Sequence, residues 1–169
     1  TGYTTANFDL WPSLSKTVLV TLMFIGACAG STGGGFKVTR VIILFKMIKR
    51  EFIKLLHPRS VRVIRFEGKP LDESTVSNTG SYLAVYTICL FAIFLAVSTD
   101  GFDLETNFTA VASCFNNIGP GLSKVGPIEN FSLYSPFSTF ILSVAMLLGR
   151  LEIFPILLAA APSTWSKRK

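Results

Sequence analysis

The feature that most constrains this chain is a run of seventeen uncharged residues, Ser81–Val97, with the sequence SYLAVYTICLFAIFLAV. A bilayer core about 30 Å thick takes roughly 20 helical residues, so this run is near the short limit for a membrane-spanning helix. Phe137–Ala161 is a second apolar run, twenty-five residues long and interrupted by Arg150 and Glu152. Half of all residues are hydrophobic and only 15% are charged, whereas a soluble domain carries about 25% charge. We therefore predict a membrane protein.

A third apolar region, residues 14–48, is too long for one straight span and too short for two spans with a turn. In its middle lies GSTGGGFKVT, residues 30–39. This stretch differs from a Walker A phosphate loop because Phe36 occupies the place of the lysine and Lys37 comes one position late. A flexible linker is a further alternative, but a linker rarely joins two apolar runs that continue one span. We expect a helix that is broken inside the membrane.

The net charge of +6 is distributed in blocks. Ten of the sixteen Lys and Arg residues lie within 37–69 and three more end the chain, whereas 98–136 holds four acidic residues and a single lysine. Basic and acidic segments that alternate across apolar runs follow the positive-inside rule. We therefore expect 37–69 and the C-terminus in the cytoplasm and 98–136 outside. Nucleic-acid binding is not expected, because the basic stretch has few aromatic side chains on which bases would stack.

The outer segment 98–136 is predicted to re-enter the membrane. DLETNFTAVASCFNNIGPGLS begins with acidic residues, which complement the positive N-terminal end of a helix. Its apolar run, Phe108–Phe115, is too short to span the bilayer and suits a half-helix. The following NNIGPG cannot continue that helix, and non-helical backbone at membrane depth persists only where protein buries it or a watery cavity borders it. Carbonyl oxygens there, beside the negative end of a half-helix, would make a cation site.

The start of the chain has the same layout, because TGYTTANF is a polar, glycine-containing stretch that precedes an apolar span. Gly2 precedes the glycine cluster 30–35 by twenty-eight to thirty-three residues, and Gly119 precedes Arg150 by thirty-one. This similar spacing indicates an internal repeat. If the repeats surround one axis, Arg150 lies at about the depth of Gly33 and faces the break in the helix.

Three blocks, GACAGSTGGGFKVTR, SCFNNIGPGLSKVG and LLGRLEIFPILL, strongly resemble the TrkH-like membrane subunit of the Trk/Ktr bacterial potassium uptake systems. Members of that family have four helix–pore-loop–helix repeats around one pseudo-fourfold potassium pathway. The resemblance covers essentially the whole chain and implies an all-α membrane protein that contains the end of repeat three and all of repeat four. It also implies that two and a half further repeats precede this sequence in the whole protein.

The resemblance further implies the site residues. TGY and NNIGP would be the third and fourth filter strands, which bind potassium only through backbone carbonyls: Thr1, Gly2, Tyr3, Asn116, Asn117, Ile118 and Gly119. AGSTGGG would be an intramembrane gating loop, with an arginine projecting toward the pore near it: Ala29, Gly30, Ser31, Thr32, Gly33, Gly34, Gly35 and Arg150. Whether the two asparagines bind the ion through carbonyls or brace the filter with their side chains is left open by the sequence.

The expected segments follow from these assignments. They are a filter strand and outer loop at 1–13, a broken inner helix at 14–56 with its loop at 29–35, a cytoplasmic linker at 57–80, an outer helix at 81–97, a re-entrant pore helix, filter and outer loop at 98–136, an inner helix at 137–161 and a cytoplasmic tail at 162–169. Ser77 or Asn78 is expected to cap the outer helix.

The functional hypothesis is potassium transport across the bacterial inner membrane, with potassium as the substrate, no bound cofactor and no catalytic residues. The resemblance implies two partners, a TrkA-like cytoplasmic nucleotide-binding regulatory subunit and a second copy in a homodimer, beside the lipid of the membrane. One alternative is a membrane subunit with a structural or assembly role. A second alternative, which fits the sequence pattern less well, is a nucleotide-binding module.

Overall fold

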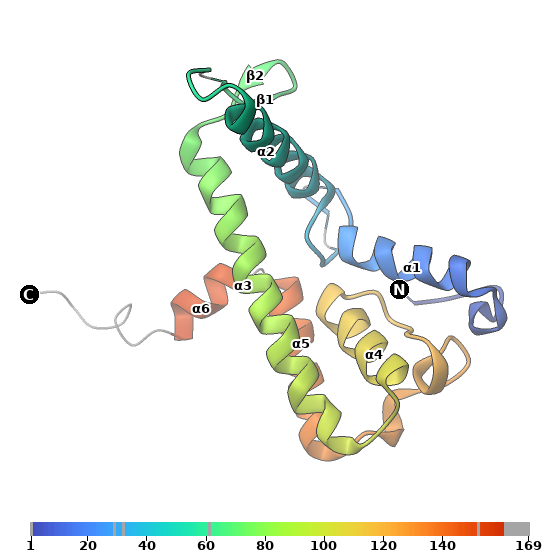
Figure 1. The fold of residues 1–169 in the computed structure, drawn as a ribbon. Helices are drawn as coiled ribbons and strands as arrows, with labels where there is room; N and C mark the ends of the chain where they lie inside the picture. The colour runs from blue at the N-terminus through green and yellow to red at the C-terminus, as the bar shows by residue number, and fades with distance from the viewer. Residues whose placement is uncertain (1, 29, 32, 61, 152, 161–169) are drawn as a thin grey trace, which may run out of the picture.

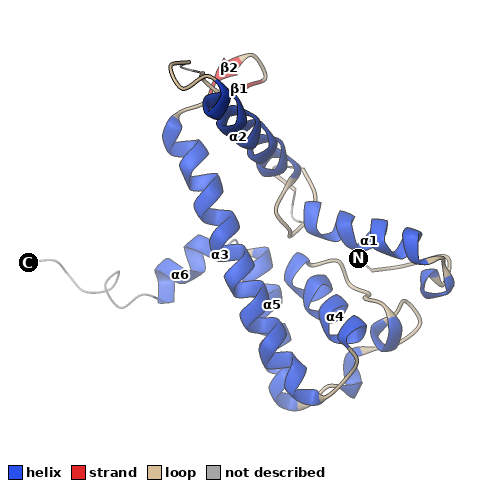
Figure 2. Cartoon of the chain, viewed as in Figure 1, coloured by secondary structure: helices blue, strands red, loops and turns tan. Residues whose placement is uncertain are grey.

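The computed structural model describes residues 2–28, 30–31, 33–60, 62–151 and 153–160. Figures 1 and 2 show that this part of the chain is helical except for connecting loops and one small hairpin. The α-helices are α1 (Ser13–Ile25), α2 (Val38–Leu56), α3 (Glu73–Val97), α4 (Leu104–Asn116), α5 (Pro136–Arg150) and α6 (Ile153–Ala160). The hairpin pairs β1 (Arg65–Phe66) with β2 (Lys69–Pro70), and short 3-10 turns are η1 (Phe8–Leu10), η2 (Ser98–Asp100), η3 (Ser123–Val125) and η4 (Phe131–Leu133).

Helix α4 is the central element of the fold. It packs against α1, α3 and α5, and Figure 1 shows it between α1 on one side and α3 with α5 on the other. Every residue from Thr106 to Asn116 except Phe108 is buried. The helix ends at Asn116 and is capped by Asn117, whose left-handed backbone (φ 55°, ψ 46°) is one that asparagine tolerates better than most residues. A helix of thirteen residues thus ends inside the protein.

Two aspartates from the α3–α4 connection fix the N-terminal ends of α4 and α5. The Asp103 carboxylate accepts hydrogen bonds from the backbone N–H of Thr106 at 3.0 Å and from its hydroxyl at 2.7 Å, which caps the start of α4. Asp100 accepts from the backbone N–H of Ser135 at 2.9 Å and from its hydroxyl at 2.8 Å. Ser135 is in turn the N-cap of α5. The end of the outer helix is therefore tied to the start of the inner helix.

Apolar side chains cover much of the exterior of the described residues as well as filling the core. The buried polar residues are Thr79, Thr106, Asn107, Thr109, Ser113, Asn116 and Ser138. Large apolar side chains point outward from α3, where Ile88, Phe91 and Leu95 are 68%, 54% and 70% exposed. Within the described residues, Glu73–Asp100 is the one helix long and apolar enough to cross a membrane, and α1 and α5 are shorter apolar helices. An extensive apolar exterior fits a lipid environment.

The connection between α1 and α2 is a closed loop. Helix α1 ends at Gly26 (φ 72°), and a Cβ on Gly26 would lie 2.6 Å from the carbonyl oxygen of Gly34. Two backbone hydrogen bonds close the neck of the loop: Phe36 N donates to Phe24 O, and Val38 N donates to Ala27 O, both at 3.1 Å. The close approach of the two backbones requires glycine at the neck.

The structure differs from the expected segments in two places. Helix α3 begins at Glu73, eight residues earlier than the expected outer helix, and its N-cap position is Asp72 rather than Ser77 or Asn78. The polar first turn is held against α2 because the Arg50 guanidinium binds the Glu73 carboxylate at 2.8 Å. Because this turn is polar, hydropathy alone places it in the linker, and for this reason the predicted start of the outer helix was too late.

The second difference lies in the inner helix expected at 137–161. Helix α5 ends at Arg150 and α6 begins at Ile153. Pro155 accounts for the break, because a proline ring clashes with the carbonyl group four residues earlier, here that of Leu151. In α6 the proline lies in the first turn, where its missing N–H costs little. The expected tail, residues 162–169, lies outside the described residues.

Candidate functional site

The two predicted filter glycines lie against each other. A Cβ on Gly119 would be 2.8 Å from the Cα of Gly2, and a Cβ on Gly2 would be 3.4 Å from the Cα of Gly119. Both have positive φ, 78° for Gly2 and 123° for Gly119. The contact brings together segments that lie 117 positions apart in the sequence. The contact leaves no room for a side chain at position 119. Backbone-to-backbone packing this close requires glycine. Thr1, the first predicted filter residue, lies outside the described residues.

Ser113 of α4 holds the fourth predicted filter strand. Its hydroxyl donates a hydrogen bond to the carbonyl oxygen of Gly119 at 2.7 Å and accepts one from the N–H of the same glycine at 3.1 Å. The backbone N–H of Ile118 donates to the carbonyl oxygen of Ser113 at 3.0 Å. The Gly119 carbonyl therefore interacts with α4. In the part of the chain that the structure describes, no group donates a hydrogen bond to the carbonyl oxygen of Asn117 or Ile118.

The side chains of both asparagines act as braces. The hydroxyl of Tyr86 on α3 donates to Asn116 Oδ1 at 2.7 Å, and Asn117 Nδ2 donates to the carbonyl oxygen of Met146 on α5 at 3.3 Å. The end of α4 is thus bound to both α3 and α5. Of the remaining predicted filter residues, Tyr3 has its side chain 93% exposed.

Two glycines, Gly34 and Gly149, approach the same residue, Asn117, at the C-terminal end of α4. A Cβ on Gly34 would lie 2.6 Å from the carbonyl oxygen of Asn116 and 3.0 Å from Asn117 Nδ2. A Cβ on Gly149 would lie 2.7 Å from the same Asn117 nitrogen and would overlap the carbonyl oxygen of Phe115. The glycine loop and the end of α5 therefore meet on Asn117, directly below the predicted filter strand.

The predicted gate residues occupy different environments. Gly34 and Gly35 are buried, Gly33 is half-buried, and Gly30 and Ser31 are exposed. Arg150 is the last residue of α5 and has an exposed side chain. Ala29 and Thr32 lie outside the described residues. Gly34 packs on the end of α4 and Gly35 on the end of α1, which is unlike a phosphate-binding loop that presents its N–H groups to a ligand.

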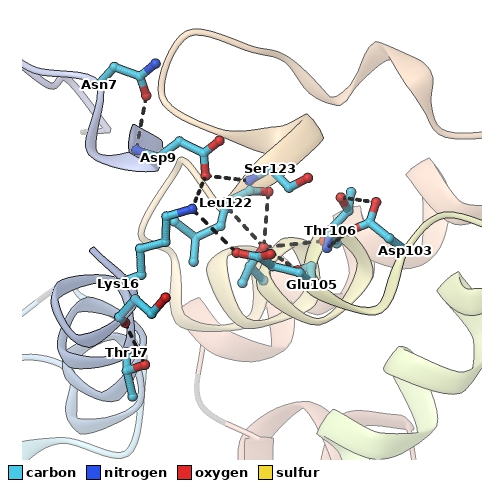
Figure 3. Close-up of polar contacts among 11 residues, drawn as sticks. Asn7, Asp9, Lys16, Thr17, Asp103, Glu105, Thr106, Leu122 and Ser123 are labelled. Carbon is cyan, nitrogen blue, oxygen red and sulfur yellow. Dashed lines mark hydrogen bonds and ion pairs between the residues drawn. The ribbon is translucent and has the colours of Figure 1, made fainter. Parts of the chain in front are cut away.

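A polar network connects the first turns of the chain to the start of α4 (Figure 3). The Lys16 ammonium lies 3.3 Å from Asp9 Oδ1 and 3.9 Å from Glu105 Oε1. Asp9 Oδ1 also accepts a hydrogen bond from the backbone N–H of Ser123 at 2.9 Å. One lysine thus joins η1 to the start of α4 and, through Asp9, to η3.

Two further contacts reinforce this arrangement. The hydroxyl of Thr109 accepts a hydrogen bond from the N–H of Leu122 at 3.0 Å, which holds the segment after Gly119 on α4. The hydrogen bonds from the hydroxyl and N–H of Thr106 lower the pKa of Asp103. Because they stabilise the carboxylate form, they keep the cap of α4 ionised at neutral pH.

Sequence reasoning did not identify Tyr86, Ser113 or the Asp9–Lys16 pair. A tyrosine in an apolar helix and a serine in a half-helix are ordinary residues, and their partners lie six to over one hundred positions away. The acidic start of α4, including Glu105, was recognised only as a complement to the helix dipole. No local pattern marks these contacts.

Helix α4 is a buried half-helix between two longer elements. It leads into a glycine-containing segment, and the outer faces around it are apolar. Together these features define a membrane protein of the helix–pore-loop–helix type. The chain belongs to the TrkH family, described as cation transport proteins, whose sequence model matches residues 1–169. This assignment confirms the family that the three sequence blocks indicated, and it agrees with the expectation that the chain is not an enzyme.

Curated relatives support the assignment. The Trk system potassium uptake protein TrkH of Escherichia coli K12 is 37% identical over 164 residues, which are 97% of this chain and 34% of that protein. TrkI of Halomonas elongata is 30% identical over 166 residues, 98% of this chain and 34% of that protein. The crystal structure of the potassium transporter TrkH from Vibrio parahaemolyticus matches with a TM-score of 0.86 and 36% identity, over 98% of this chain and 35% of that one. The chain therefore spans about a third of the length of these relatives.

Proposed function

We propose that this chain forms part of a potassium pathway and contributes two of its four filter strands. The observation that carries this proposal is the contact of Gly2 with Gly119 at the C-terminal end of α4. It joins the two strands at the place where a re-entrant helix ends. The relatives named above are potassium uptake proteins and a potassium transporter. Two further strands, from repeats outside this sequence, would complete a pseudo-fourfold ring.

The backbone carbonyls of Asn117 and Ile118 are the proposed potassium ligands. Neither oxygen accepts a hydrogen bond from the described residues, so both are available to replace water around an ion. The C-terminal end of α4 carries the negative end of the helix dipole, which favours a cation. The carbonyl of Gly119 has a hydrogen bond from Ser113, so the role of this glycine is to permit the close contact with Gly2 rather than to supply the first ligand.

The glycine loop between α1 and α2 is the proposed gate. Its neck is fixed by the backbone contacts of Gly26 with Gly34 and Gly35, whereas Gly30 and Ser31 are exposed. Glycine backbone changes conformation at little cost, so the loop tip can move while the neck remains in place. Arg150 adds a positive charge at the level of the loop, since Gly149 and Gly34 contact the same asparagine. A positive charge there raises the energy of a passing cation.

The remaining proposals concern the whole protein. We propose that it lies in the bacterial inner membrane, with the basic segment 37–69 and the C-terminus in the cytoplasm, in accord with the distribution of charge. We further propose regulation by a TrkA-like nucleotide-binding subunit and assembly into a homodimer. Both rest on the family resemblance.

Potassium flux in liposomes that contain the full-length protein tests the filter and the gate together. Wild-type protein should carry potassium, and removal of residues 30–33 should raise the flux measured without the regulatory subunit. The deletion spares Gly34 and Gly35, which pack against α4 and α1. A deletion variant that folds normally and shows unchanged or lower flux would contradict the gate. A wild-type protein without potassium flux would contradict the proposed function.

A further inference from the structure

Tyr86 occupies a fixed position between the proposed filter and the proposed gate. Its side chain is 6% exposed, and the hydroxyl lies 2.7 Å from Oδ1 of Asn116, which is completely buried. The tyrosine ring contacts Phe115 with a centroid distance of 4.9 Å and Phe36 with a centroid distance of 6.2 Å. Phe36 is itself buried and directly follows the glycine loop. Rings on two sides therefore hold the hydroxyl where it meets the asparagine.

Asn116 is the residue through which α4 passes into the filter strand. It is the last residue of the helix, followed by the left-handed Asn117 and then by Ile118. Its Nδ2 atom is buried and has no hydrogen-bond partner among the described residues. The bond from Tyr86 is thus the one hydrogen bond that the structure gives to this carboxamide within the described residues. This hydrogen bond ties the end of α4 to α3, so its loss would let the backbone that carries the proposed carbonyl ligands shift.

We propose that Tyr86 is a positioning residue that sets the ion selectivity of the fourth filter strand, by holding Asn116 through its hydroxyl. The inference rests on the filter assignment made under Proposed function. Carbonyl filters discriminate between cations through the position and number of their oxygens. A change in the backbone after Asn116 therefore alters the balance between potassium and the smaller sodium ion. Tyr86 itself does not touch the ion; it acts through the asparagine.

The chain contains a matched control at the other end of the same helix. The hydroxyl of Tyr134 donates to Oδ1 of Asn107 at 3.0 Å, and these two side chains are 6% and 2% exposed. Both tyrosines thus donate to a buried asparagine of α4. Asn107 lies in the first turns of the helix, far along it from the filter strand. Tyr134→Phe and Tyr86→Phe each remove one hydroxyl of the same kind and keep the ring.

The test is the ratio of potassium to sodium flux in liposomes that contain full-length protein. A buried hydrogen bond contributes about 1 kcal/mol, so we expect Tyr86→Phe to lower the ratio about fivefold. Tyr134→Phe should leave the ratio at the wild-type value. An unchanged ratio in Tyr86→Phe, or equal changes in both variants, would overturn the inference, because the hydroxyl would then have no effect or only a general effect on α4.

Two further outcomes are distinguishable. If Tyr86→Phe is recovered in too small an amount, Asn116→Leu removes the acceptor of the same hydrogen bond, and an unchanged flux ratio in that variant also overturns the inference. A wild-type protein that carries no potassium contradicts the proposed function and this inference with it. A wild-type protein that conducts, with an unchanged ratio in Tyr86→Phe, contradicts the inference alone.

Discussion

Gly149 of α5 lies so close to the carbonyl group of Phe115 that a Cβ at this position would overlap the oxygen. The inner helix therefore touches the pore helix through backbone atoms at the point where α4 ends. The same glycine precedes Arg150, so the contact also fixes the place from which the arginine side chain starts.

Replacement of Gly149 by alanine should destabilise the protein, although alanine is normally favoured over glycine within a helix by about 1 kcal/mol. Forcing a methyl group into such a packed site costs typically 1–3 kcal/mol. Thermal unfolding of the purified protein in detergent measures the effect. Gly80→Ala is the matched control, because Gly80 is also helical and its Cβ would meet only Met47 Cε at 3.9 Å. Equal or higher stability of Gly149→Ala would contradict the contact.

Gly119→Ala should strongly reduce potassium uptake by cells that depend on the full-length protein. The added Cβ would lie 2.8 Å from the Cα of Gly2 and would separate the two filter strands. Gly101→Ala is the control for backbone strain alone, because Gly101 also has a positive φ (74°) but has no atom within 4 Å of its Cβ position. Equal uptake by the two variants, at equal abundance in the membrane, would show that the strand contact is not needed.

Arg150→Ala should change potassium conduction more than Glu129→Ala does. Arg150 ends α5 beside the glycine that contacts the end of α4, whereas Glu129 lies in an exposed turn of the outer segment. Removal of the positive charge lowers the barrier to a cation, so the expected direction is a higher flux. Flux measurements on both variants in liposomes provide the comparison, and small, equal effects would remove Arg150 from the pathway.

Acidification should weaken the cap of α4. The pKa of Asp103 is lowered by its hydrogen bonds from Thr106, so the native state favours the carboxylate. The stabilisation is complete above the unfolded-state pKa of about 4 and is lost as the pH falls through the lower native pKa. Asp103→Asn should reduce the decline in melting temperature between neutral and acid pH. A decline of the same size in the variant would assign the acid sensitivity to other groups.

The sequence was sufficient to predict the class of protein and the position of the short helix α4. Bilayer thickness restricts which apolar runs can span, and glycine and proline in NNIGPG end a helix wherever it lies. The expected half-helix at Phe108–Phe115 falls within α4 (Leu104–Asn116) for this reason. The boundaries of α3 and α5 were less predictable. The first turns of α3 are polar and contain no apolar run that would mark a helix start, and the end of α5 depends on a proline inside an apolar run.

The sequence by itself determined that this chain belongs in a membrane, that its backbone breaks at two glycine-containing stretches, and which family it resembles. These properties follow from composition and local backbone chemistry. Only the tertiary structure decided that Gly2 meets Gly119, that Ser113 binds the peptide groups of that glycine, and that Tyr86 holds Asn116. The physical reason is that close packing and hydrogen bonding act between atoms brought together through space, and no local pattern encodes which distant residues will meet.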